Sequence, residues 1–328
     1  MTILVTGSAG HLGEALMRSL HAASRSAIGI DRKASPFTQR VGDIADRAFV
    51  RTAMRGVRAV IHTATLHKPH VATHSAQDFI DTNISGTLAL LEEAVAAGVS
   101  AFVFTSTTST FGAALTPGTG QPAAWINEHV APIPKNIYGT TKLAAENLCE
   151  LFHRKQRLSV LVLRTSRFFP EADDHAGTRD AYDIANAQAN ELLYRRADIE
   201  DVVSAHLLAV ERAPAVGFGR YIISATSPFA PEDLALLHRD APAVVQRLFP
   251  SFQALYNARG WRMFPRVDRV YVNALARHEL GWQPKYHFAQ VLACLAAGRD
   301  FRSPLALAVG AKGYHDTTFG DMPYPVTP

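Results

Sequence analysis

The sequence has few of the features that stabilise small secreted domains or anchor a protein in a membrane. Its 328 residues include only two cysteines, Cys149 and Cys294, and neither has metal-ligand spacing, so we expect no disulfide framework. No apolar run approaches the roughly 20 residues that cross a bilayer, which argues against a membrane protein. The amino-terminal residues contain no basic leader, and we therefore expect a cytoplasmic protein.

A strong charge of either sign is also missing. The 33 basic and 29 acidic residues give a formal net charge of +4, which is too small and too dispersed to indicate nucleic acid as a partner, although it is compatible with a small anionic ligand. The hydrophobic fraction of 48% and the charged fraction of 19% are those of an ordinary globular protein. At about 150 residues per domain, the length predicts one large domain or two closely associated ones.

The sequence does contain an alternation of short β-branched runs with helical patterns. The runs are apolar on both faces, as in strands that are buried in a parallel sheet. We expect strands at Ile3–Thr6, Ala27–Asp31, Val41, Ala59–His62, Ala101–Thr105, Ser159–Arg164 and Arg220–Ile223, and helices at Gly10–His21, Ala45–Met54, Phe79–Ala97, from about Tyr138, and at Val202–Ala213. This order predicts a doubly wound parallel α/β sheet, the Rossmann fold.

The alternation is interrupted after residue 167 and resumes at residue 199, and from residue 226 the chain becomes helical and is punctuated by proline. Short helices are expected at Pro231–Leu237, Ala243–Leu248, Asn273–Glu279 and Phe288–Ala297. We therefore expect a Rossmann domain over residues 1–167 and 199–225, and a smaller, discontinuous, mainly helical substrate lobe over residues 168–198 and 226–302. An extended C-terminal tail is expected over residues 303–328.

The turn after the first strand is rich in glycine. Gly7, Gly10 and Gly13 follow a buried strand and open a helix, with His11 and Leu12 between the last two glycines. The first two glycines let backbone N–H groups approach a pyrophosphate, and the third lets the helix pack against the strand. An ordinary strand-to-helix turn is the alternative. We predict that these five residues bind a dinucleotide.

Carboxylates follow at the ends of the next two strands. Asp31 stands where the adenosine ribose of a bound dinucleotide should lie. A carboxylate there repels a 2′-phosphate and favours NAD, whereas the adjacent Arg32 leaves NADP as an alternative. Asp43 and Ile44 are placed to contact the adenine, although Asp43 also fits a cap for the helix expected at Ala45.

Further motifs occur in order along the chain. They are His62-Thr63-Ala64-Thr65, Asn83-Ile84-Ser85-Gly86-Thr87, the segment from Phe104 to Gly112, and Tyr138-Gly139-Thr140-Thr141-Lys142. With the glycine-rich turn, they resemble the extended short-chain dehydrogenase/reductase family, also called the NAD-dependent epimerase/dehydratase family, over residues 1–300. The resemblance implies that Ala64, Thr65 and Asn83 lie beside the cofactor.

Three residues carry the expected chemistry. Tyr138 and Lys142 are four residues apart, so they share one face of a helix. An ammonium group beside a phenol lowers a pKa that is about 10 when unperturbed, which would make Tyr138 an acid/base; an exposed helix pair is the alternative. The resemblance implies that both residues contact the nicotinamide ribose, and that Thr107, in preference to Ser106, hydrogen-bonds the reacting oxygen.

The chain departs from the family pattern at two places. Relatives that dehydrate sugars have a carboxylate directly after the catalytic threonine, whereas this chain has Thr108 and Ser109 there, so dehydration is disfavoured and Thr108 becomes a candidate substrate contact. Arg167 replaces the asparagine of sugar-nucleotide epimerases. This argues for a substrate other than a nucleotide sugar, although an arginine is itself suited to clamp a phosphate or carboxylate.

Other candidate substrate contacts follow from the resemblance. His67 and Lys68 lie in the loop that would border the nicotinamide, and Arg262 is the first of three nearby arginines, for which a solvated basic face is the alternative. The spacing of His67, His70 and His74 is conceivable for metal ligands, but no carboxylate or cysteine completes the set, and we expect no metal.

The expected function is hydride transfer between NAD(P) and a carbinol or carbonyl carbon of a sugar-like or acidic small molecule. The first alternative is an epimerase of the UDP-glucose 4-epimerase type that retains NAD, and the second is a non-catalytic NAD-binding regulator. The resemblance also implies a homodimer that forms through the helices at Phe79–Ala97 and Tyr138–Phe152.

Overall fold

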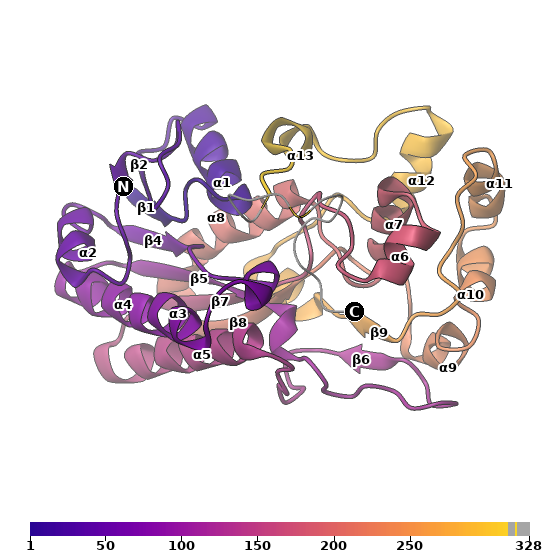
Figure 1. Cartoon of the computed structure of the whole chain (residues 1–328), viewed down its shortest axis with the longest axis horizontal. Helices are drawn as coiled ribbons and strands as arrows, with labels where there is room; N and C mark the ends of the chain where they lie inside the picture. Colours follow the sequence, from indigo (N-terminus) through magenta and orange to yellow (C-terminus); the bar gives the residue numbers. More distant parts are fainter. Residues whose placement is uncertain (314–318, 320–328) are drawn as a thin grey trace.

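The computed structural model describes residues 1–313 and 319, and its centre is a seven-stranded parallel sheet (Figure 1). The strand order is β3-β2-β1-β4-β5-β7-β8. These strands are β1 (Ile3–Thr6), β2 (Ala27–Asp31), β3 (Arg40–Val41), β4 (Ala59–His62), β5 (Ala101–Thr107), β7 (Val160–Thr165) and β8 (Phe218–Ile223). The predicted fold class is confirmed, and the order reverses between β1 and β4, where doubly wound sheets bind their ligands.

Helices cover both faces of the sheet and form most of the second lobe. The α-helices are α1 (His11–Ala22), α2 (Arg47–Ala53), α3 (Ala76–Phe79), α4 (Gly86–Ala96), α5 (Ile137–Gln156), α6 (Ala176–Ala181), α7 (Ile184–Glu191), α8 (Ile199–Val216), α9 (Leu234–Leu237), α10 (Ala241–Leu248), α11 (Phe252–Asn257), α12 (Phe288–Ala296) and α13 (Pro304–Val309). Short 3-10 turns are η1 (Lys68–Ala72), η3 (Thr108–Thr110) and η4 (Pro231–Asp233), and π turns are η2 (Ile80–Ser85) and η5 (Ala276–Leu280).

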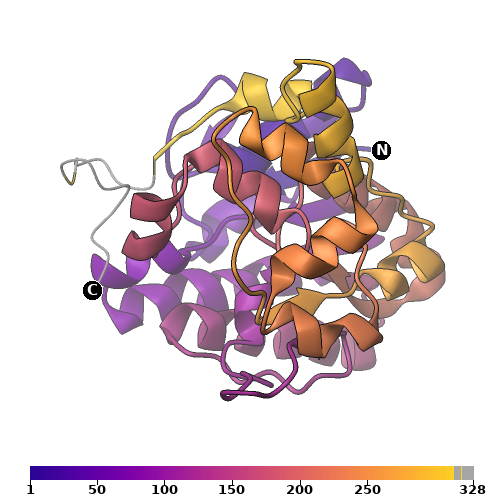
Figure 2. The ribbon, with the colours of Figure 1, turned by 90° about the vertical axis from the view of Figure 1, so that its right-hand side faces the viewer.

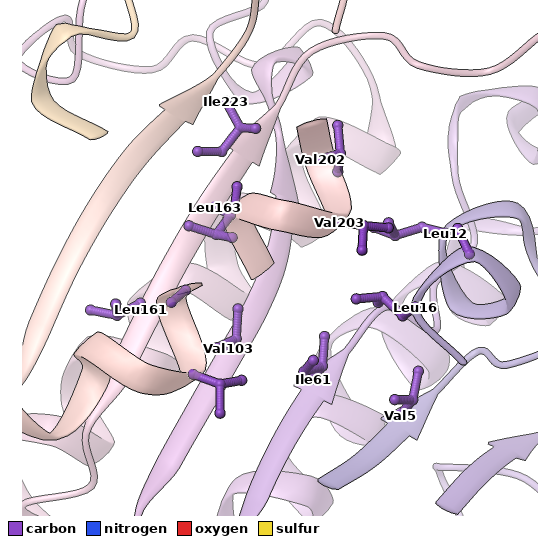
Figure 3. Close-up of a cluster of buried hydrophobic side chains, with 14 of the residues drawn as sticks. Val5, Leu12, Leu16, Ile61, Val103, Leu161, Leu163, Val202, Val203 and Ile223 are labelled. Atoms are coloured by element: carbon purple, nitrogen blue, oxygen red, sulfur yellow. The ribbon is translucent and has the colours of Figure 1, made fainter. Parts of the chain in front are cut away.

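The strands are apolar on both faces because both faces are covered. Along β1, Ile3 and Val5 join a core with α1, α8 and α13, which Figure 3 shows around Leu16. Leu4, between them, joins the opposite core with α2, α4 and α5. Burying a side chain of this size stabilises the fold by roughly 1.5–3 kcal/mol. The sheet is therefore closed on both faces, and its accessible edge for a ligand is the carboxyl end of the strands.

The second lobe packs beside that edge. It contains α6, α7 and α9 to α12 (Figure 2) and a two-stranded parallel sheet of β6 (Ala124–Ile126) and β9 (Arg269–Tyr271). Phe252, Tyr256 and Phe288 lie in its hydrophobic core. The segment that contains β6 was expected within the Rossmann domain, but it pairs with β9 of this lobe.

Two segments differ from the sequence-based expectation. The helix expected over Phe79–Ala97 is divided by the π turn η2, and residues 304–309, expected to be extended, form α13. Ser303 caps α13 by accepting a hydrogen bond from the backbone N–H of Ala306, and Pro304 suits the first helical position. The rest of the predicted tail, residues 314–318 and 320–328, lies outside the described residues. Within the described part, no helix has the length and apolar character needed to cross a bilayer.

Candidate active site

A cavity of about 990 Å³ lies at the carboxyl ends of the parallel strands, between the sheet and the second lobe. Most of the residues that the sequence nominates line it: Gly7, Gly10, His11, Leu12, Gly13, Asp31, Arg32, Asp43, Ile44, Ala64, Thr65, His67, Lys68, Thr107, Thr108, Tyr138 and Arg167. Asn83, Lys142 and Arg262 do not line it. This volume lies at the upper end of the range of about 300–1,000 Å³ that is common for small-molecule pockets.

The glycine-rich turn brings β1 and α1 into backbone contact. Gly7 has a φ of +72°, which favours glycine. A Cβ atom on Gly13 would lie 1.9 Å from the carbonyl oxygen of Gly7, so only glycine fits without moving the helix. No side chain caps the N-terminus of α1 at Gly10. The first N–H groups of the helix therefore face the cavity, where they can bind an anion.

Asp31 is held rigidly at the end of β2. Its two carboxylate oxygens accept hydrogen bonds from the backbone N–H of Ala9, at 3.0 Å, and of Lys33, at 2.8 Å. Arg32 is turned toward Asp43, with 3.4 Å between Nε and Oδ2. Arg32 is thus partly neutralised by a carboxylate.

Asp43 accepts a hydrogen bond from the backbone N–H of Ala45, but it does not cap the helix, which was the alternative to a contact with the adenine. The helix α2 begins two residues later, at Arg47, because Asp46 accepts hydrogen bonds from the N–H groups of Ala48 and Phe49. Asp43 therefore remains a cavity-lining residue in a turn.

His62 is the centre of a buried polar chain that sequence reasoning missed. Its Nδ1 lies 2.8 Å from Thr6 Oγ1, and its Nε2 lies 3.0 Å from Thr87 Oγ1. The Thr87 hydroxyl donates to the carbonyl of Asn83, so its oxygen must accept from His62 Nε2–H, and Nδ1 accepts from Thr6. Burial, and then the charge of Lys142, hold the pKa of His62 well below its usual value, so the ring is neutral and acts as a structural link.

Asn83 is fully used by the protein itself. Its Oδ1 accepts from the Thr65 hydroxyl and the Leu66 N–H, both at 2.9 Å, while its Nδ2 donates to the Leu66 carbonyl at 2.9 Å and to Thr141 Oγ1 at 3.0 Å. Asn83 is 2% exposed. The expected direct contact with a cofactor is therefore corrected: Asn83 fixes the loop at Thr65 to the helix α5.

Tyr138 and Thr107 meet at the wall of the cavity. Asn136 caps α5 by accepting from the N–H of Gly139 at 3.0 Å, which places Tyr138 in the first turn. Thr107 ends β5, and its side chain hydrogen-bonds Tyr138. Burial raises the pKa of Tyr138 to about 12, and the bond to Thr107 offsets part of that rise.

Lys142 lies one turn further along α5, behind the cavity wall. It is 2% exposed, and its Nζ is 4.0 Å from the centroid of the Phe104 ring. Burial lowers the pKa of Lys142 to about 7, while Cys149 and Glu146 act in the opposite direction. The sequence led us to expect that Lys142 lowers the pKa of Tyr138. In the structure, burial disfavours the charged forms of both Tyr138 and Lys142, and the pKa of Tyr138 is therefore raised.

This burial predicts a pH-dependent stability. Between the pKa of about 7 in the folded protein and 10.5 in the unfolded chain, the unfolded state binds more protons at Lys142, so the contribution of this group to the free energy of unfolding rises with pH. We expect Lys142→Met to stabilise the protein most at and below about pH 7 and progressively less toward about pH 10. Urea unfolding at several pH values measures this, with exposed Lys155→Met as control. Equal pH slopes for the two variants would contradict it.

A buried ion pair lies next to Lys142 and Thr107. Glu146, 0% exposed, lies one turn beyond Lys142 and binds Arg164 with contacts of 2.7 and 3.0 Å. The Ser106 hydroxyl donates to the same carboxylate at 2.5 Å. Ser106 and Arg164 are paired in register on β5 and β7. Sequence reasoning missed this pair because its only signals were weak. They were a charged residue at the end of an apolar strand and a Glu four residues after Lys142.

Most of the candidate substrate contacts line the same cavity as Tyr138. The His67 ring stacks on Phe169 at 5.3 Å between centroids and lies 6.5 Å from the Tyr138 ring. Arg262 is corrected: its guanidinium donates to the carbonyl of Ala181 and lies over the Tyr182 ring, away from the cavity.

Arg266 and Arg269, the other two of the three arginines that the sequence offered as candidate phosphate contacts, do line the cavity. The lining cations that sequence reasoning did not name are Lys135, Arg195 and Lys312. Three histidines of η1 and its surroundings lie close together, with ring centroids 4.7 Å apart for His67 and His70 and 5.0 Å for His70 and His74. In the described part of the chain, no group of three or more His, Cys, Asp or Glu side chains has an arrangement that could hold a metal ion.

Comparison with known proteins gives partial matches to several enzymes. The chain is 32% identical over 165 residues to UDP-glucose 4-epimerase of Erwinia amylovora (45% of this chain, 47% of the relative). It is 27% identical to sterol demethylase protein B of Methylococcus capsulatus (81% and 84%), and 31% identical to NAD-dependent glucose-6-phosphate dehydrogenase of Haloferax volcanii (49% and 66%). The chain thus spans about half the length of the epimerase.

A solved structure supports the fold assignment. A short-chain dehydrogenase/reductase superfamily protein from Agrobacterium tumefaciens, crystallised with bound NAD, superposes with a TM-score of 0.66 at 24% identity, covering 90% of this chain and 96% of that one. The sequence profile of the NAD dependent epimerase/dehydratase family matches residues 3–223, which include the glycine-rich turn, Thr107, Tyr138 and Lys142. The chain belongs to the NAD dependent epimerase/dehydratase family.

Proposed function

We propose that this protein is an NAD-dependent oxidoreductase that transfers a hydride between nicotinamide and a carbinol or carbonyl carbon of a sugar-like small molecule. The observation that carries the proposal is that one cavity joins the glycine-rich turn and Asp31 at one end to Thr107 and Tyr138 at the other. In this proposal residues 1–167 and 199–225 form most of the cofactor domain, and residues 168–198 and 226–302 form most of the substrate lobe.

The residues around the turn fit the dinucleotide. The uncapped N-terminus of α1 and the close Gly7–Gly13 contact form a backbone cradle for a pyrophosphate. Asp31, already oriented by two N–H groups, would accept the ribose hydroxyls, and Asp43 and Ile44 would contact the adenine. Arg32 keeps NADP as the alternative, and Ala64 and Thr65 line the path toward the nicotinamide. When bound, NAD supplies the hydride acceptor.

The chain's own groups then control the proton. Because the pKa of Tyr138 is about 12, its hydroxyl is protonated near neutral pH and is suited to donate a proton to a carbonyl oxygen during reduction. Thr107 orients that hydroxyl and binds the same substrate oxygen, and Thr108 lines the wall beside it. Lys142 acts from behind Tyr138 as a buried cation that becomes neutral above about pH 7.

A substitution in the backbone cradle tests this cofactor site. Gly13→Ala places a Cβ against the Gly7 carbonyl, so α1 must move away from β1. We expect NADH to bind at least about tenfold more weakly and the free energy of unfolding to fall by roughly 1–3 kcal/mol. Fluorescence titration and urea unfolding measure the two effects. Gly118→Ala, in an open loop, is the matched control, and equal NADH affinity in both variants would contradict the assignment.

One observation favours an epimerase with retained NAD as the second candidate. The backbone N–H of Lys312 lies 3.2 Å from both His11 Nε2 and Glu171 Oε1, and the Lys312 ammonium pairs with Glu14 of α1. The C-terminal segment thus lies across the start of α1 and would restrict exchange of a bound dinucleotide. The homodimer and the cytoplasmic location stay predictions.

Identifying the nucleotide that the purified protein carries separates the two candidates. The protein is denatured, and the released nucleotide is identified and quantified by mass spectrometry. Near-stoichiometric NAD favours the epimerase, whereas an empty protein that binds added NADH supports the cofactor-exchanging oxidoreductase. A protein that binds no nicotinamide nucleotide would contradict both.

A further inference from the structure

The substrate end of the cavity carries an excess of positive charge. Its charged lining comprises six basic residues and two acidic ones: Lys68, Lys135, Arg167, Arg195, Arg266 and Arg269 against Asp174 and Asp268. The whole chain has a formal charge of only +4. Asp173 and Glu191, which do not line the cavity, pair with Arg167 and Arg195 and offset part of this charge. The excess that remains favours an incoming anion, because a concave surface focuses its field.

Two of these cations converge on one carboxylate. The Lys68 ammonium contacts Asp174 Oδ2, and Arg167 Nη1 lies 3.2 Å from Asp174 Oδ1. Lys68 comes from η1 and Arg167 follows β7, so two separate elements bring them together. The Arg167 Nε is buried without a hydrogen-bond partner among the residues that the structure describes, and its guanidinium is not fully satisfied by the protein.

The loop that contains Asp174 is also held by contacts of its other residues. Asp173, its neighbour, is anchored by Arg195 at 3.0 Å, and Glu171 is anchored by His11 at 2.8 Å. Arg167 Nη2 donates to the carbonyls of Glu171 and Ala172 at 3.1 and 2.7 Å. Asp174 is the acidic residue of this loop that lines the cavity.

The cation pair lies close to the reacting centre. His67, directly before Lys68, has its ring 6.5 Å from that of Tyr138, and Phe169, two residues after Arg167, stacks on the same histidine. An anionic group bound by Lys68 and Arg167 would therefore lie near the reacting centre at Tyr138.

We propose that Lys68 and Arg167 bind the anionic group of a monosaccharide substrate, a carboxylate or a phosphate monoester, and that Asp174 occupies this position until the substrate displaces it. The proposal rests on the proposed function, because it names the substrate class of the same cavity. Charge-assisted hydrogen bonds from a lysine and an arginine are the strongest that a side chain can offer to such a group. Asp174 meanwhile offsets the cost of leaving two cations unpaired at the cavity wall.

The test is a set of calorimetric titrations on the full chain, saturated with NADH. The probes are D-glucuronate, D-glucose 6-phosphate, uncharged D-glucose and UDP-glucose. We expect one or both anionic monosaccharides to bind more tightly than D-glucose, and the tighter of the two identifies the carboxylate or the phosphate. Lys68→Ala should weaken that binding at least tenfold, and Asp174→Asn should strengthen it severalfold, with little change for D-glucose.

Matched controls remove the effect of net charge alone. Exposed Lys155→Ala and Asp81→Asn make the same charge changes away from the cavity and should leave all four affinities unchanged. Three results would overturn the proposal. Both anionic monosaccharides fail to bind, UDP-glucose binds more tightly than either of them, or Lys68→Ala and Asp174→Asn bind the anionic monosaccharides with the affinity of the unmodified protein. NADH binding is measured in a separate titration of each variant and of the unmodified protein. If the unmodified protein does not bind NADH, the proposed function, and not this proposal alone, is overturned.

Discussion

Tyr138→Phe is expected to reduce turnover by about 10²–10⁴-fold, the range that a positioned acid/base contributes. The substitution removes only the hydroxyl that hydrogen-bonds Thr107, and it keeps the ring in a site where the tyrosine is 8% exposed. NADH affinity and the urea midpoint should therefore change little. Turnover is followed by NADH absorbance with the sugar that the titrations select.

The distribution of the loss between kcat and KM is part of the expectation. The proton of Tyr138 is transferred only in the chemical step, so kcat should fall while KM stays nearly constant. Tyr182→Phe, whose ring lies under Arg262 in the second lobe and does not line the cavity, is the matched control and should keep full activity. Full activity of Tyr138→Phe would exclude Tyr138 as the proton donor.

Much of the sheet could be predicted from sequence because its strands are local patterns. Each central strand is a short, largely β-branched run that is buried on both faces. The composition of the run indicates both the strand and its burial. The glycine-rich turn was predictable for a related reason, since a backbone contact such as that of Gly13 with Gly7 leaves glycine as its visible consequence. Local chemistry thus predicted the end of the cavity that we propose binds the cofactor.

What was missed depends on partners that are distant in the sequence. The pairing of β6 with β9 joins residues 124–126 to residues 269–271, and no local pattern shows it. Asn83 matches a family motif, but only the fold shows that its amide is consumed by Leu66, Thr65 and Thr141.

The three arginines of the second lobe illustrate the same limit. Only backbone direction decides that Arg262 turns toward Ala181 while Arg266 and Arg269 line the cavity. The pKa of Tyr138 was likewise expected in the wrong direction, because the spacing from Lys142 was visible in the sequence and the depth of burial was not.

The second large expected effect concerns stability, at the buried pair of Glu146 and Arg164. Glu146→Leu leaves the guanidinium of Arg164, which is 3% exposed, without its carboxylate. Breaking such a pair by removing one partner typically costs about 3–5 kcal/mol. We expect a loss of that size in the free energy of unfolding by urea. Glu150→Leu, which breaks a half-exposed pair with Arg220 one turn further along α5, should cost about 1 kcal/mol or less.

The double variant Glu146→Leu, Arg164→Met decides whether the pair serves stability or geometry. Replacing both charges with apolar groups removes their desolvation cost, so most of the lost stability should return. Arg220, whose Nε lies 3.3 Å from Glu146 Oε2, loses that contact but keeps Glu150 as a partner. Turnover should not return with the stability. Ser106 loses the carboxylate that accepts a hydrogen bond from its hydroxyl at 2.5 Å, and this change displaces Thr107, which follows Ser106 directly on β5. A stable double variant with a low kcat and unchanged NADH affinity would show that this pair positions the Thr107 end of the site. Full recovery of kcat would mean that packing alone holds Thr107 in place.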